Sequence, residues 1–110
     1  MGKVNLLVKY CLKNLENEYN IKGIFYDNQI KFLEKDNKMI LNLTESSLTR
    51  ITLNEEIFFN FNEKTCLIKD KKSNNQISFP IEVMSLKKSN NYFYVKYKIE
   101  DVFEILIKII

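Results

Sequence analysis

Histidine and tryptophan are absent from the chain of 110 residues, and cysteine, glycine and proline are scarce. Histidine is the usual general base beside a serine or cysteine nucleophile, and it is also the commonest metal ligand. The two cysteines, Cys11 and Cys66, lack the paired spacing of a zinc site. The sequence therefore predicts no catalytic residue, no bound metal and no cofactor, and we expect a protein without enzymatic activity.

The two cysteines also indicate whether the protein resides in a reducing or an oxidising compartment of the cell. A disulfide between Cys11 and Cys66 stays open, but two buried thiols in a reducing cytosol is the favoured interpretation. Residues 4–8 form too short an apolar run for a secretory signal, and no run approaches the length that crosses a membrane. We therefore expect a cytoplasmic protein that does not act at a membrane.

Charge of one sign is also in short supply. The chain has 17 basic and 14 acidic residues, a net charge of +3, and the two signs alternate along it. Such a small excess argues against nucleic acid as a partner. With 45% hydrophobic residues the chain can bury a core, and its two glycines and one proline argue against disorder. We expect a single domain over residues 1–110.

What the chain does have is alternation with a period of two. Its last two segments, residues 92–99 and 102–110, alternate between apolar and polar side chains and predict two strands. To keep both apolar faces on one side of the sheet, we expect a three-residue loop over residues 100–102. That loop places Lys98 opposite Glu104 and pairs Ile99 with Phe103, Tyr97 with Ile105, and Val95 with Ile107.

Two Asp-Asn dipeptides suit two-residue hairpin turns, because both residue types tolerate positive φ. With turns at Asp27-Asn28 and Asp36-Asn37, one apolar face continues through three successive strands, which predicts a meander. The expected pairs are Phe25 with Ile30 and Gly23 with Phe32 across the first turn, and Phe32 with Leu41 and Ile30 with Leu43 across the second.

The remaining segments complete an all-β fold. Residues 4–12 fit either a strand or a helical stripe, and the strand is favoured because strand signals fill the rest of the chain. Pro80 cannot donate to a β-ladder, so its strand should lie at an edge or be bulged. Further strands are expected at residues 18–26, 48–53, 56–61, 64–70 and 76–84, with polar turns at 71–75 and 87–91.

The fold class we predict is a small antiparallel meander β-barrel of about eight to ten strands. Barrels of about eight strands are either filled by their own side chains or hold one small ligand. Large inward residues favour a filled interior with a small cavity at best; they are Phe25, Phe32, Phe59, Phe79 and Phe93.

Four short segments carry a family resemblance: Ile21-Lys22-Gly23, Ile30-Lys31-Phe32-Leu33-Glu34, Leu48-Thr49-Arg50 and Val95-Lys96-Tyr97-Lys98-Ile99. In these segments the chain resembles the YwiB-like family of small bacterial proteins. The resemblance covers nearly the whole chain and implies a calycin, or lipocalin-like, β-barrel. The family has no established activity, so the resemblance implies no site residues.

Arg50 is the candidate ligand-binding residue. It is the one arginine among 17 basic residues, which suggests that its position requires a planar fork that is always charged. One interpretation is a contact to a ligand carboxylate or phosphate inside the barrel. Another, which we favour from the sequence, is a closure residue at the barrel end that binds backbone carbonyls or stacks on an aromatic ring, and that is partly buried and hydrogen-bonded within the domain. Chance use of arginine is the third interpretation. Glu34 shares a face with Phe32 and is expected at the rim of the barrel.

Tyrosine and lysine alternate on the other face of residues 92–99, as Tyr92, Tyr94, Lys96 and Lys98. Such a surface is typical of sheets that bind single-stranded nucleic acid by stacking and charge. An ordinary solvated outer face explains the same pattern and is favoured.

Taken with the composition, these features predict a binding module without enzymatic activity. Its partner would be a small apolar or amphipathic ligand held in the barrel, or another protein. The alternative is a protein that binds single-stranded RNA or DNA through the Tyr92–Lys98 face. A third possibility is a structural or regulatory subunit of another protein.

Overall fold

The computed structural model describes residues 2–110, which form eleven β-strands and no helix, and so no helix that could cross a membrane. Aromatic and β-branched residues at alternating positions give the strands their apolar inner face. The strands are β1 (Gly2–Leu12), β2 (Leu15–Tyr26), β3 (Gln29–Glu34), β4 (Asn37–Asn42), β5 (Ser47–Ile51), β6 (Glu55–Asn60), β7 (Thr65–Asp70), β8 (Gln76–Pro80), β9 (Glu82–Ser89), β10 (Tyr92–Ile99) and β11 (Asp101–Ile109).

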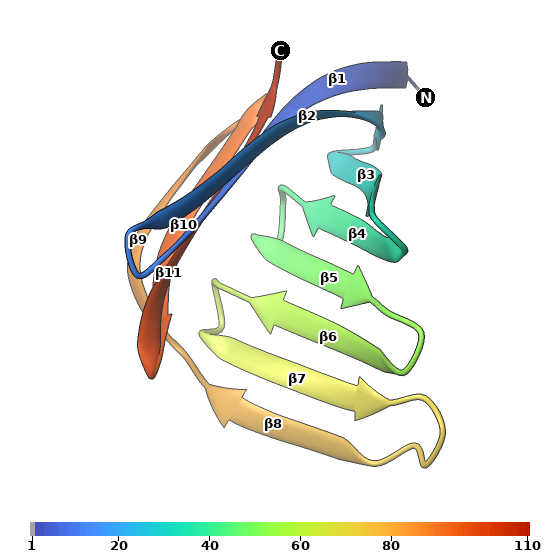
Figure 1. Ribbon diagram of the computed structural model, residues 1–110, viewed down its shortest axis with the longest axis vertical. Coiled ribbons are helices and arrows are strands. Elements are labelled where there is room, and N and C mark those ends of the chain that lie inside the picture. Colours follow the sequence, from blue (N-terminus) through green and yellow to red (C-terminus); the bar gives the residue numbers. More distant parts are fainter. Residues whose placement is uncertain (1) are drawn as a thin grey trace.

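All of these strands belong to one antiparallel sheet that curls into a nearly closed barrel (Figure 1). Each strand pairs with its sequence neighbours, except that β8 and β9 do not pair and β1 pairs with β11. The opening in the sheet therefore lies between β8 and β9, which Ile81 joins. In Figure 1, β9, β10, β11, β1 and β2 form one layer, and their strands cross those of β3 to β8 steeply. The predicted all-β meander barrel is confirmed.

The barrel has slightly more strands than expected because the chain bends after Pro80. The strand predicted over residues 76–84 is two strands, of which β8 ends at Pro80 and β9 begins at Glu82. β8 pairs only with β7, so the proline lies in an edge strand, as predicted. Residues 4–12, whose sequence fitted either a strand or a helix, belong to the strand β1.

The turn between β2 and β3 is the predicted one. Asp27 and Asn28 both have positive φ, 52° and 59°, as a type I′ turn requires. Gly23 is needed on β2, because a Cβ there would stand 2.8 Å from the carbonyl oxygen of Lys31. Both pairs expected across this turn are present, Phe25 with Ile30 and Gly23 with Phe32.

The turn between β3 and β4 lies one residue earlier than predicted. It consists of Lys35 and Asp36, with Lys35 at a φ of 56°, so the turn predicted at Asp36-Asn37 is wrong. The register differs from the prediction by two residues, which leaves every side chain on its expected face. The observed pairs are Ile30 with Leu41 and Phe32 with Met39.

The three-residue loop predicted over residues 100–102 is also wrong, and the register of β10 against β11 again differs from the prediction by two residues. The turn between β10 and β11 is centred on Glu100, which has a φ of 60°. Lys96, and not Lys98, therefore lies opposite Glu104. The inward pairs are Phe93 with Ile107, Val95 with Ile105, and Tyr97 with Phe103.

The core lies inside the barrel, on the faces that alternation predicts. Of the five phenylalanines expected inside, Phe32 and Phe93 are buried, and Phe25, Phe59 and Phe79 are partly buried against the core. The buried apolar residues are Leu6, Val8, Ile30, Phe32, Met39, Leu41, Leu43, Leu48, Phe61, Cys66, Ile81, Phe93, Val95, Tyr97, Ile105 and Ile107.

Candidate functional site

A cavity of about 430 Å³ that is partly open to solvent lies between β4 to β6 on one side and β1, β10 and β11 on the other. The expectation of a small cavity at best is therefore wrong. Its volume falls within the range of about 300–1,000 Å³ that is usual for small-molecule sites. The apolar part of the wall consists of Leu12, Met39, Leu48, Phe59, Ile99, Phe103 and Ile105.

Arg50 lines this cavity from β5. The register sets its direction: it lies opposite Met39 of β4 and Ile57 of β6, and shares a face with the buried Leu48. The side chain is half-buried, as expected. The expectation of a hydrogen-bonded guanidinium is wrong at Nε, which is buried and has no partner within residues 2–110. Over the same part of the chain Arg50 forms no ion pair.

A carboxylate lines the same cavity. Glu34, at the end of β3, accepts a hydrogen bond of 2.5 Å from the hydroxyl of Tyr10 on β1. Both residues, with Asn17, also line a second hollow of about 410 Å³ beside the first. Burial, and then the bond to Glu34, hold the pKa of Tyr10 far above its usual value. Tyr10 is therefore a neutral donor that holds Glu34 in place.

Tyr19, on β2, adds a further donor next to this pair. Its ring lies 6.2 Å from that of Tyr10, measured between centroids. Its hydroxyl is buried and finds no hydrogen-bond partner in the described part of the chain. Burial and then Glu34 raise its pKa, whereas the charge of Arg50 acts in the opposite direction. Tyr19 thus lies within electrostatic reach of both charged groups.

An aromatic cluster separates the cavity from the rest of the interior. Tyr97 is at its centre, with ring centroids 5.2 Å from Phe61, 5.3 Å from Phe103 and 5.6 Å from Phe59. Tyr97, Phe59 and Phe103 line the cavity, whereas Phe61 is 1% exposed and packs against Phe93 at 5.9 Å. We call the region around Phe61, Phe93, Leu41 and Cys66 the filled part, and the region around Arg50 the cavity part.

A second cation shares the inward side of β9 but is exposed near the end of that strand. Lys88 of β9 lies opposite Phe93, and its Nζ donates to the carbonyl oxygens of Leu43 and Thr44 at 2.8 and 3.2 Å. Its charge is therefore met by backbone acceptors. Arg50 has no comparable acceptor at Nε.

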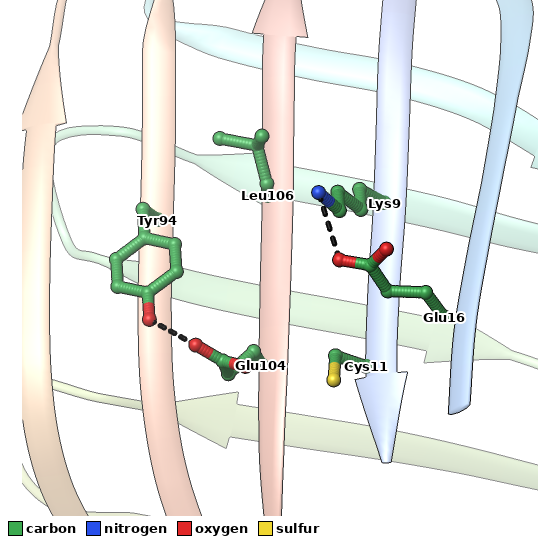
Figure 2. A pocket seen from close by; sticks show the side chains of 6 residues that line it. All are labelled: Lys9, Cys11, Glu16, Tyr94, Glu104 and Leu106. Carbon is green, nitrogen blue, oxygen red and sulfur yellow. Dashed lines mark hydrogen bonds and ion pairs between the residues drawn. The ribbon is translucent and has the colours of Figure 1, made fainter. Parts of the chain in front are cut away.

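On the outer face, a hollow of about 120 Å³ is lined by side chains of β1, β2, β10 and β11 (Figure 2). Lys9 and Glu16 form an ion pair of 2.8 Å, and the hydroxyl of Tyr94 donates to Glu104. Burial and then this bond raise the pKa of Tyr94 to about 12, and the same bond lowers that of Glu104. The hollow is much smaller than the cavity beside Arg50.

The Tyr/Lys face is formed as expected, since Tyr92, Tyr94, Lys96 and Lys98 share the outer side of β10. The neighbouring strand, however, places Glu104 opposite Lys96. The hydroxyl of Tyr94 is already bonded to that carboxylate, as Figure 2 shows. An acidic group therefore stands within the surface proposed for nucleic acid.

Residues 2–110 contain no cluster of three or more histidine, cysteine or acidic side chains that could hold a metal ion. Both cysteines are free thiols, with Cys66 buried and Cys11 partly exposed. Comparison with known proteins found no match to a family model, a curated protein or a solved structure. The function must therefore be argued from the site itself.

Sequence reasoning singled out Arg50 and placed Glu34 on the correct face, but it missed Tyr10 and Tyr19. Tyr10 and Glu34 are 24 positions apart and lie on strands that do not pair with each other. Their alternation put both on inward faces, and that was the available signal. The contact itself depends on how steeply the sheet curls, which a pattern of period two does not specify.

Proposed function

We propose that this protein binds a small apolar or amphipathic molecule in the cavity beside Arg50, and that it has no enzymatic activity. The observation that carries the proposal is the cavity of about 430 Å³, whose surface is mainly apolar and whose charged groups are Arg50, Glu34 and Glu104. Concave apolar sites with one or two oriented polar groups are the usual form of small-molecule sites.

We further infer a calycin-type barrel in the sense of the YwiB-like resemblance, working in the cytoplasm. The supporting observations are the segments Leu48–Arg50 and Val95–Ile99, which carry the resemblance and also line the cavity with Leu48, Arg50, Tyr97 and Ile99. A protein partner in place of a small ligand would use an outer surface. The hollow of about 700 Å³ beside Asn5, Asn20 and Lys22 is more open than the cavity, and its apolar lining is limited to Ile21 and Ile110.

Single-stranded nucleic acid is the weaker candidate. Stacking needs free aromatic faces within a positive surface. On β10, Tyr94 is tied to Glu104, and the net charge is only +3. We therefore expect any binding to be weak and to vanish at physiological salt, which a titration with labelled single-stranded DNA would measure.

The test of the proposal uses Nile red, a neutral dye whose fluorescence rises in apolar sites. Wild type should enhance it, and decan-1-ol should displace it. Leu12→Trp fills the cavity from a position that is 37% exposed and should abolish the enhancement. Leu33→Trp, at a site 62% exposed and away from the cavity, is the matched control and should bind like wild type. Equal dye binding by both variants would refute the site.

A further inference from the structure

We propose that the ligand is a monocarboxylate with an apolar chain, and that the guanidinium of Arg50 binds its carboxylate. The inference rests on the proposed function and adds the chemical class of the ligand. It is carried by the buried, unpartnered Nε of Arg50, which lines an otherwise mainly apolar cavity.

The need for an anion follows from the state of Arg50. A guanidinium is charged at every physiological pH, and a buried donor without an acceptor is costly to the fold. The other inward-directed cation, Lys88, has two carbonyl acceptors, whereas Nε of Arg50 has none among residues 2–110. A carboxylate matches the guanidinium fork with two parallel hydrogen bonds, and so supplies what the fold leaves out.

The charge of the ligand is limited by Glu34 and Glu104. Both carboxylates line the same cavity as Arg50, and neither forms an ion pair with it within residues 2–110; Tyr10 donates a hydrogen bond of 2.5 Å to Glu34, and Tyr94 donates one to Glu104. A second negative charge on the ligand would be repelled by Glu34 without a second cation to offset it. The site therefore favours a single negative charge over the two charges of a phosphate monoester.

The apolar chain follows from the wall. Beyond the guanidinium, the cavity is bounded by Met39, Leu48 and Phe59 on one layer and by Ile99, Phe103 and Ile105 on the other. Each buried methylene contributes about 0.8 kcal/mol of favourable transfer. An apolar chain or ring system of medium size fits this volume. A short polar acid would leave most of the apolar wall in contact with water.

Titration calorimetry of the wild-type protein with a series of decyl compounds tests the proposal. The series is decanoate, decan-1-ol, decyltrimethylammonium and decyl phosphate, at about pH 8 where the phosphate is dianionic. Decanoate should bind about tenfold or more tighter than decan-1-ol, since one charge-assisted bidentate contact separates them. Equal affinity of these two, or tighter binding of the phosphate or the ammonium compound, would overturn the inference.

Two variants assign the preference to Arg50. Arg50→Met keeps an apolar side chain of similar reach and should reduce the affinity for decanoate to that for decan-1-ol. Lys31→Met removes one positive charge from an exposed position on the outer side of β3 and should leave both affinities unchanged. If Arg50→Met still bound decanoate more tightly than decan-1-ol, another residue would be responsible for the preference and the proposal would be contradicted.

The outcomes also separate this inference from the proposed function. If decan-1-ol and decanoate bind equally, the cavity takes apolar ligands but Arg50 does not select them. If none of the decyl compounds binds, the proposed function itself fails. The wild-type series decides between these results even if Arg50→Met does not fold.

Discussion

The filled part and the cavity part of the interior are built from the same strands and the same alternation, yet they differ in what fills them. In the filled part, Phe61 and Phe93 are 1% and 0% exposed and pack ring against ring. In the cavity part, Phe59 and Phe103 are only partly buried and border about 430 Å³ of space. In a domain of 110 residues, side chains that filled this cavity would make the fold more stable. The presence of the cavity therefore suggests that it serves a purpose other than stability.

The two inward cations show the same contrast. Lys88 is compensated by the chain itself, through the carbonyl oxygens of Leu43 and Thr44. Arg50 is placed by β5 among apolar side chains and is left uncompensated at Nε. The two cations differ in both burial and compensation: Lys88 is exposed and bonded to backbone carbonyls, whereas Nε of Arg50 is buried without an acceptor in residues 2–110. Under our proposal, backbone carbonyls compensate Lys88 and a ligand compensates Arg50.

The largest expected effect separates the two parts by stability. Phe61→Ala removes a fully buried ring from the filled part and should lower the free energy of unfolding by about 3–5 kcal/mol. Phe103→Ala removes a ring that borders the cavity and should cost clearly less, because solvent already reaches one side of it. Urea unfolding measures both. Equal losses would show that the interior is packed alike throughout.

A smaller effect should appear in alkali. Burial raises the pKa of Cys66 from 9.0 to about 11, so the folded state keeps its thiol proton longer than the unfolded state does. Its contribution is therefore complete below about pH 9 and is lost as the pH rises to about 11. On the order of 1–2 kcal/mol should be lost over that interval. Buried tyrosines add to the slope at still higher pH.

The variant Cys66→Ala isolates that contribution. Its stability should fall less steeply between pH 9 and pH 11 than that of wild type. Burial also raises the pKa of the Cys11 thiol, but Cys11 is only partly buried, so Cys11→Ala should change the slope less than Cys66→Ala does. Urea unfolding at a series of pH values provides the comparison. If the free energy of unfolding had the same pH dependence in wild type and Cys66→Ala, water would have access to the Cys66 thiol in the folded state.

The smallest effect compares the two cations. Lys88→Met leaves two carbonyl oxygens without their donor and should cost about 1 kcal/mol, since Lys88 is exposed and water replaces part of the loss. Arg50→Met removes a buried donor that lacks an acceptor and should leave stability unchanged or raise it slightly. Thermal unfolding of both variants is the measurement. A destabilised Arg50→Met would restore Arg50 as a closure residue.

The faces of the strands could be predicted from the sequence, but the registers could not. Both wrong turns, at Asp36-Asn37 and over residues 100–102, moved the pairing by two residues. A shift of two preserves every face, so alternation offers no penalty against it. The same dipeptide was predicted correctly at Asp27-Asn28, where both residues have positive φ, and wrongly at Asp36-Asn37, so the residue types alone do not determine where a turn lies.

The direction of Arg50 could not be predicted because its strand is short and has apolar residues on both faces. Leu48 argued for an inward Arg50, while Ile51 and Leu53 argued for the opposite. Leu53 in fact lies beyond the end of β5 and is 88% exposed. The cavity was missed for another reason. Counting large inward residues does not reveal whether two steeply crossing layers bring them together, and Phe59 and Phe103 stop short of closing the space.

The most direct test of the account is the Nε–Hε resonance of the arginine side chain in a nitrogen–proton correlation spectrum. Arg50 is the one arginine among the 17 basic residues, so a single side-chain signal reports on the site. Decanoate should shift this signal and slow its exchange with water, because the carboxylate accepts the hydrogen bond that Nε lacks. Decan-1-ol should leave it nearly unchanged. If decanoate binds while the Arg50 signal stays in place, the guanidinium does not bind the ligand and the central claim is wrong.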